Sequence, residues 1–153
     1  MKKALFALWL PLSLLACSTK NDVPRPDAAT VISGEYQLNR TASFSNDQPG
    51  YDIILPQKVG NNTRTGTLMV TRNAASVVSV SLVQRINGTA GNTTTFGKMD
   101  VKAAGSGYAL SRYDSDKQQT GTGTADGTAI TIEFSDTYSP TMTTTRYVLE
   151  AKR

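Results

Sequence analysis

The sequence predicts an all-β fold, a small antiparallel up-and-down barrel of about eight strands over residues 33–153, with a β-sandwich as the alternative. Apolar and polar residues alternate from Ser33 onward, as in strands with one buried face. Clusters of Gly, Asn, Asp and Ser interrupt this alternation at short intervals. This part of the chain shows no convincing 3.6-residue apolar period, so we expect strands and turns alone.

Each expected strand is a short run between turn residues, and VVSVSLV alternates most clearly. Its inward face carries Val78, Val80 and Leu82, while two serines face outward. The run QQTGTGT is weak because it contains two glycines. In chain order, strands are expected over residues 34–40, 51–55, 65–71, 77–83, 95–103, 107–113, 118–124, 129–135 and 143–152.

Polar turns separate these runs. NGTAGN, residues 87–92, is expected as a turn, and Asp126-Gly127 is expected to form a tight hairpin. Threonine is frequent, most visibly at 93–95, 120–124 and 143–145, and β-branched side chains of this kind suit exposed strand faces.

The inward positions carry bulky side chains. An eight-stranded barrel is just wide enough to be filled by side chains or to hold one small ligand. We therefore expect a narrow cavity or none. The inward set includes Tyr36, Leu55, Leu68, Leu82, Met99, Tyr108, Phe134 and Tyr147.

Residues 1–16 have the layout of an export signal peptide. Lys2 and Lys3 precede an apolar segment, which Pro11 interrupts. As a helix, this segment would be about 20 Å long, whereas the hydrocarbon core of a bilayer is about 30 Å thick. A transmembrane anchor is therefore not expected.

The tetrapeptide Leu14-Leu15-Ala16-Cys17 resembles the lipobox of bacterial lipoproteins. The resemblance implies that a diacylglyceryl group alkylates the thiol of Cys17, that the chain is cut before it, and that the freed amine is acylated. Several acyl chains anchor a protein stably in a membrane. Ser18 resembles the pattern of lipoproteins sorted to the outer membrane, so we expect a lipid-anchored protein of the cell envelope. The alternative is an ordinary secretory signal in which Cys17 is a small apolar residue.

Residues 17–32 are expected to form the lipidated N-terminus and a flexible tether. The stretch from Ser18 to Ala29 is polar and contains Pro24 and Pro26, without an apolar period. The single barrel domain would then begin at residue 33.

Composition excludes several kinds of chemistry. Histidine is absent and the one cysteine is assigned to lipid attachment, which excludes Ser-His-Asp and Cys-His catalysis and disulfides within the chain. Removing the signal peptide takes away two of 16 basic residues, so the charge of the mature chain is 14 minus 12, or plus two. This weak basicity gives no support for nucleic-acid binding.

Two carboxylate pairs are candidate sites. Asp114 and Asp116 lack the continuation of a calcium-binding loop and are expected in a turn. Glu133 and Asp136 would suit glycoside hydrolysis, but Glu133 is out of phase with its apolar neighbours and is expected on the outer face. The sequence therefore predicts no enzyme, metal ion or cofactor.

The first expected strand begins Gly34-Glu35-Tyr36, which resembles the Gly-X-Trp opening of lipocalin-like (calycin) barrels with tyrosine in place of tryptophan. In this resemblance, a basic residue of the last strand, Arg146 or Lys152, would pack near Tyr36. It implies a closed barrel whose mouth admits a small apolar ligand.

Two functions from different classes are consistent with these observations. The first is a membrane-anchored module that binds a small apolar ligand, with Tyr36, Tyr108 and Arg112 as candidate ligand-binding residues. The second is a structural or interaction protein whose solid barrel presents a Thr-rich surface to an envelope partner or a glycan. A cavity in the barrel would favour the ligand-binding module, and a filled barrel would favour the structural or interaction protein.

Overall fold

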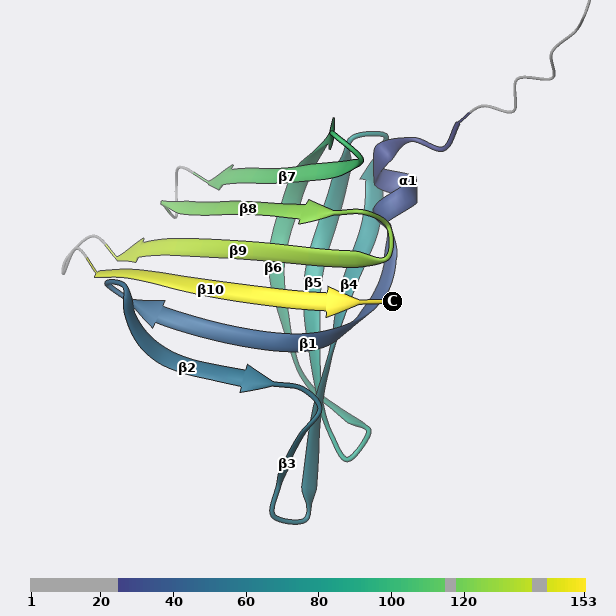
Figure 1. Ribbon diagram of the computed structural model, residues 1–153. Helices are drawn as coiled ribbons and strands as arrows, with labels where there is room; N and C mark the ends of the chain where they lie inside the picture. The colour runs from purple at the N-terminus through teal and green to yellow at the C-terminus, as the bar shows by residue number, and fades with distance from the viewer. Residues whose placement is uncertain (1–24, 115–117, 139–142) are drawn as a thin grey trace, which may run out of the picture.

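The computed structural model describes residues 25–114, 118–138 and 143–153, which form one helix and one continuous antiparallel sheet (Figure 1). Cys17, with its proposed lipid, lies outside the described residues. The elements are α1 (Ala28–Ile32), β1 (Gly34–Ser45), β2 (Gln48–Ile54), β3 (Gln57–Val59), β4 (Asn62–Ala74), β5 (Val77–Ile86), β6 (Thr89–Ala104), β7 (Gly107–Asp114), β8 (Gln119–Ala125), β9 (Ala129–Tyr138) and β10 (Thr143–Lys152).

Eight of the strands close into an up-and-down barrel. From β4 to β10, each strand pairs with the next along the chain, and β1 pairs with both β10 and β4. The remaining strands, β2 and β3, extend the sheet beyond this ring. The predicted barrel is confirmed, and the sandwich alternative is wrong because the sheet closes on itself rather than forming two packed layers.

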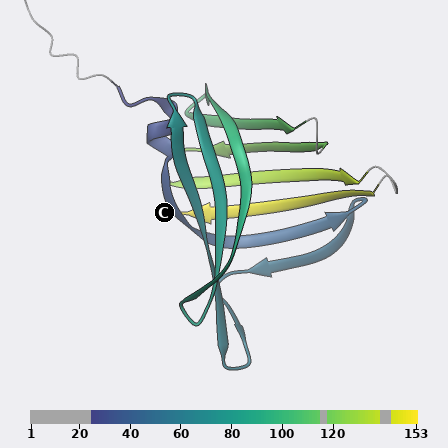
Figure 2. The ribbon, with the colours of Figure 1, turned by 180° about the vertical axis from the view of Figure 1, so that it is seen from behind.

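The barrel is closed at one end and open at the other, because two of its seams are only partly paired. We use the word seam for the line along which two neighbouring strands meet, and the two seams are β1–β4 and β6–β7. Residues 34–37 of β1 pair with β4, but from residue 40 onward β1 pairs with β2 instead. Strands β6 and β7 pair only over residues 100–104 and 107–111. The strands therefore diverge into two groups, β3–β6 and β7–β10 with β1 and β2, which cross one another (Figures 1 and 2).

Helix α1 packs against the closed end. Ala29 and Ile32 are completely buried, and the backbone N–H of Ala29 donates to the carbonyl of Ala75. The Asp27 carboxylate caps the helix at the N–H of Thr30, 2.8 Å away. The predicted tether over residues 17–32 thus extends too far, because residues 28–32 belong to the folded domain and apolar period alone does not reveal a five-residue helix.

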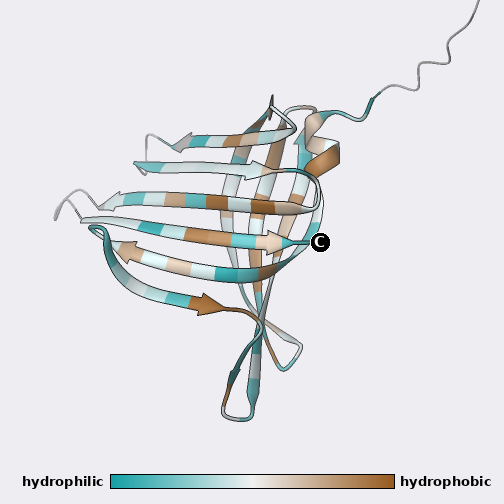
Figure 3. Cartoon of the chain, in the orientation of Figure 1, coloured by the Kyte–Doolittle hydropathy of each residue, from teal (hydrophilic) through white to brown (hydrophobic). Residues whose placement is uncertain are grey.

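The core follows the predicted alternation. Tyr36, Leu68, Leu82, Met99 and Phe134 are buried, as expected of inward positions. Leu55 and Tyr108 pack against this core and are partly buried, and Tyr147 is half-buried. The apolar residues alternate with polar ones along the strands in Figure 3.

Two boundaries differ from expectation. The three-residue strand β3 was not predicted, because Gln57–Val59 has a single apolar residue. The expected turn over residues 87–92 shortens to Asn87 and Gly88, whose φ angles are 51° and 80°. Pairing between β5 and β6 resumes at once with Ile86 opposite Thr89, so polar residues here continue a strand. The Asp126-Gly127 hairpin between β8 and β9 is confirmed.

Candidate functional site

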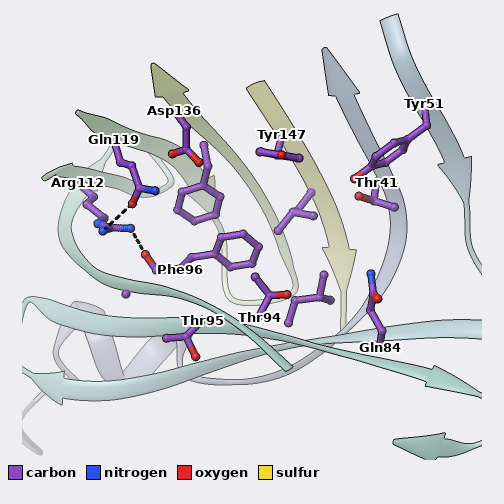
Figure 4. A pocket seen from close by; sticks show the side chains of 14 residues that line it. Thr41, Tyr51, Gln84, Thr94, Thr95, Phe96, Arg112, Gln119, Asp136 and Tyr147 are labelled. Atoms are coloured by element: carbon purple, nitrogen blue, oxygen red, sulfur yellow. Dashed lines mark hydrogen bonds between the residues drawn. The ribbon is translucent and has the colours of Figure 1, made fainter. Parts of the chain in front are cut away.

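The main candidate site is an open cavity of about 650 Å³ where the two groups of strands diverge, called here the mouth cavity. One wall comes from β5 and β6, with Leu82, Gln84 and Thr94 (Figure 4). The facing wall comes from β1, β2 and β7–β10, and includes Tyr51 and Tyr147. A space of this size is within the range of small-molecule sites.

A pair of stacked aromatic rings joins the two walls. Phe96 of β6 and Phe134 of β9 have ring centroids 4.3 Å apart and an interplanar angle of 7°. Such rings supply a flat apolar surface of high contact area. They form one side of the mouth cavity and also limit how far β6 can move from β9.

Arg112 fixes the polar end of the cavity. Its guanidinium donates to the carbonyl of Phe96 and, at 3.2 Å, to the side chain of Gln119 (Figure 4). It also donates to the Asp114 carboxylate at 2.9 Å. The side chain is only 14% exposed, so these contacts are shielded from water. Arg112 therefore links β6, β7 and β8 across the unpaired part of the β6–β7 seam.

Asp136 adds a carboxylate to the same cavity. Among the described residues it has no ion-pair partner, whereas Arg112 is neutralised by Asp114. The mouth cavity thus combines an aromatic surface with a rim of carboxylate, amide and hydroxyl groups.

The expectation of a narrow or absent cavity is wrong. Bulky inward residues such as Leu68 and Met99 fill the closed half of the barrel, as predicted. The open half carries Thr41, Thr94 and Gly97 at positions that line the cavity, and these are small or polar. Because two seams also separate there, the side chains do not fill the space between the walls.

A second cavity of about 450 Å³ adjoins the first and is called here the side cavity. Thr41 and Gln84 line both cavities. Its lining includes the buried Leu38, the partly buried Leu55 and the exposed Arg64.

Tyr36 lies outside both cavities, at the closed end. Its buried hydroxyl donates to the carbonyl of Ile32, 2.8 Å away, and the Arg153 guanidinium lies 4.7 Å from its ring centroid. Burial raises the pKa of Tyr36. The packing partner expected from the calycin resemblance was Arg146 or Lys152, and the partner is Arg153 instead.

The two residues named for that role lie elsewhere. Arg146 packs over the ring of Phe44 at 4.3 Å and donates to Glu133 at 3.2 Å, and Lys152 is exposed opposite Gln37. Glu133 is thus on the outer face, as its phase in the strand predicts, and does not face Asp136 in the cavity.

Tyr108 lines a third, smaller cavity of about 290 Å³ near the turns that follow β6 and β8. The structure therefore does not bring the three predicted ligand-binding residues together, and only Arg112 among them lines the mouth cavity.

Three residues that line the mouth cavity were not predicted from the sequence as site residues: Phe96, Gln119 and Tyr51. For Phe96 the sequence does hold a clue, because a β-bulge at Phe96-Gly97 reverses the inward phase of β6, and glycine within a strand often marks a bulge.

Asp114 contacts Arg112, while Asp116 lies outside the described residues. Within residues 25–114, 118–138 and 143–153, no cluster of three His, Cys, Asp or Glu side chains is placed to hold a metal ion. In the same part of the chain, no helix is long and apolar enough to cross a membrane.

Comparison with known proteins adds little to this description. No protein-family description matches the chain, and no curated protein is similar to it in sequence. Solved structures that share its outline include EF1p2_mFAP2b bound to DFHBI, at 11% identity and a TM-score of 0.44 over 85% of this chain and 99% of that one. A redesigned β-barrel, mFAP1, bound to DFHBI shows 16% identity and a TM-score of 0.39 over 83% and 99% of the two chains. A fluorescence-activating β-barrel designed de novo shows 15% identity and a TM-score of 0.38 over 83% and 97%. These values are too low to support an argument about function, which must come from the site itself.

Proposed function

We propose that this protein is a binding module that holds a small, largely apolar ligand in the mouth cavity. The observation that carries the proposal is the open cavity of about 650 Å³ with the Phe96–Phe134 stack on one side. Ligand sites are typically concave and mostly apolar, with a few polar groups that fix orientation. Here Gln119, Asp136 and Tyr147 supply such groups.

The arrangement favours binding over catalysis. Glu133, the other half of the carboxylate pair considered from the sequence, is ion-paired with Arg146 on the outer face. Asp136 is thus separated from the carboxylate considered as its catalytic partner, and the chain has no histidine to act as base. We propose a non-enzymatic role on these grounds.

We further propose that the module is held at a membrane of the bacterial envelope by lipid on Cys17, with the outer membrane as its destination. The support is the lipobox-like tetrapeptide at residues 14–17. Replacing the thiol by Cys17→Ser should shift the full chain from the membrane fraction to the soluble fraction and remove the mass of the acyl groups. An unchanged membrane fraction and a change of mass equal to the substitution alone would refute the anchor.

Ligand binding is tested with the fragment 18–153, which contains all the described elements and the whole buried core. The probe is N-phenyl-1-naphthylamine, a neutral aromatic molecule whose fluorescence rises in apolar surroundings. We expect saturable binding at one site per chain. Thr94→Trp, which places a large side chain in the mouth cavity, should weaken binding at least tenfold, because a filled cavity excludes the probe.

The matched control is Thr122→Trp, the same substitution at an exposed position of β8. It should leave the affinity for the probe unchanged. Absence of saturable binding, or equal loss in both variants, would refute the mouth cavity as the binding site.

A further inference from the structure

The open end of the barrel continues into a protruding tip, where β3 pairs with the start of β4 and β5 forms a hairpin with β6 (Figure 1). Arg64 and Ile86 are direct cross-strand neighbours, and Arg85 lies opposite Thr65 one position along. Val59 is two residues from Gln57, which lines the side cavity, so both share one face of β3. We call Val59, Arg64, Arg85 and Ile86 the basic tip.

The basic tip exposes aliphatic side chains. Val59 is 46% exposed and Ile86 is 49% exposed, although Ile86 is in phase with the buried residues of β5, such as Leu82. Ile86 and Arg64 also line the side cavity, together with the apolar Leu38 and Leu55. The apolar interior of the side cavity is therefore continuous with exposed apolar side chains at the tip.

The basic tip also carries positive charge without compensating carboxylates. Residues 53–99 contain five Lys or Arg residues and no Asp or Glu. On the barrel body, arginines at positions 40, 72, 112 and 146 are each ion-paired with a carboxylate. Arg64 and Arg85 have no ion pair or side-chain hydrogen bond among the described residues, so their guanidinium groups are available to an external anion.

We propose that the basic tip binds the surface of an anionic lipid bilayer. Basic side chains near such a surface are attracted to its negative headgroups, and adjacent aliphatic side chains gain further stability by entering the interfacial region. A nucleic acid would call for stacking aromatics or base-edge contacts, which Val59 and Ile86 do not supply. The alternation of charge and aliphatic surface favours lipid.

This inference deepens the proposed ligand-binding function and depends on it in one respect. If the mouth cavity takes a small apolar ligand, a tip seated on a bilayer would let that ligand enter through the side cavity without crossing water. Helix α1, the first described element, lies at the opposite end of the barrel from the tip (Figure 1).

The test uses the fragment 18–153, which lacks Cys17, and measures its sedimentation with vesicles. We expect binding to vesicles that contain phosphatidylglycerol, little binding to phosphatidylcholine alone, and loss of binding in high salt. Arg64→Gln with Arg85→Gln should weaken binding by about fivefold for each charge removed. Val59→Ser with Ile86→Ser should also weaken it, because the inserted apolar surface is lost.

The matched control is Lys98→Gln with Lys102→Gln, which removes the same charge from exposed positions of β6 away from the tip. Equal weakening by this control, or no preference for phosphatidylglycerol, would overturn the proposal. Binding to heparin that is as tight as binding to vesicles and insensitive to Val59→Ser with Ile86→Ser would also overturn it, in favour of a soluble polyanion. If the variants of the tip keep full affinity for N-phenyl-1-naphthylamine while vesicle binding is absent in every case, the tip proposal fails and the ligand-binding proposal stands.

Discussion

Tyr36 joins helix α1 to the closed end of the barrel. Its hydroxyl is buried and donates to the carbonyl of Ile32. Tyr36→Phe should reduce the free energy of unfolding by about 1 kcal/mol, because the buried carbonyl loses its hydrogen bond. Urea denaturation measures this loss. The hydroxyl of Tyr108 has no hydrogen-bond partner among the described residues, so Tyr108→Phe should have little effect, and equal losses in both variants would contradict this account.

Asp126 stabilises the hairpin between β8 and β9. The backbone N–H groups of Ala129 and Thr128 donate to its carboxylate and lower the pKa of Asp126 from 3.8 to about 2. Because the folded-state pKa is below the unfolded one, this stabilisation is complete above about pH 4 and is lost as the pH falls toward 2.

The stability difference between the wild type and Asp126→Ala should therefore be largest near neutral pH and shrink as the pH falls toward 2. Urea denaturation across this pH range measures it. The control Asp100→Ala removes an exposed carboxylate that accepts no hydrogen bond from the described residues, and it should leave stability unchanged. A difference for Asp126→Ala that is constant with pH would show that charge at this turn is unimportant.

Residue alternation was a good guide to burial where the strands are regular. It assigned Leu68, Met99 and Phe134 correctly to the interior. It failed at Phe96, because the bulge at Phe96-Gly97 shifts the phase of β6 by one residue. It also could not identify Arg153 as the partner of Tyr36, because that contact depends on how the two ends of the chain meet in space.

At the scale of elements, the β6–β7 seam determines the width of the mouth cavity. Beyond Asp100 and Ser111 the two strands no longer pair, and the seam is bridged by Arg112 and by the Phe96–Phe134 stack. The sequence did not reveal this divergence, since each strand alone has the same alternation whether or not its neighbour stays in register. The predicted strands were largely correct, while the open space between them was not expected.

Arg112→Gln should loosen the β6 segment at this seam. The substitution removes the contacts of the guanidinium with the carbonyl of Phe96 and the carboxylate of Asp114. Amide hydrogen exchange of residues 93–97 should become at least tenfold faster, because local opening becomes easier. Arg146→Gln breaks an outer-face ion pair with Glu133 and should leave exchange of this segment unchanged. Equal acceleration in both variants would mean that Arg112 acts on global stability rather than on the seam.

For the whole molecule, the barrel is closed by α1 at one end and opens at the other into two cavities and the basic tip. The fold class followed from alternation and turn residues. The difference between the closed end and the open end did not. It arises from two partly paired seams and from a region without carboxylates, which only the folded structure places beside a cavity.

The central claim is that ligands bind in the mouth cavity rather than elsewhere on the barrel. Nuclear Overhauser effects between N-phenyl-1-naphthylamine and the fragment 18–153 test it most directly, because they report which protons lie close to the bound probe. We expect contacts with the rings of Phe96, Phe134 and Tyr147. Contacts confined to Tyr108 at the closed end, or to the outer face at Thr122, would contradict the claim.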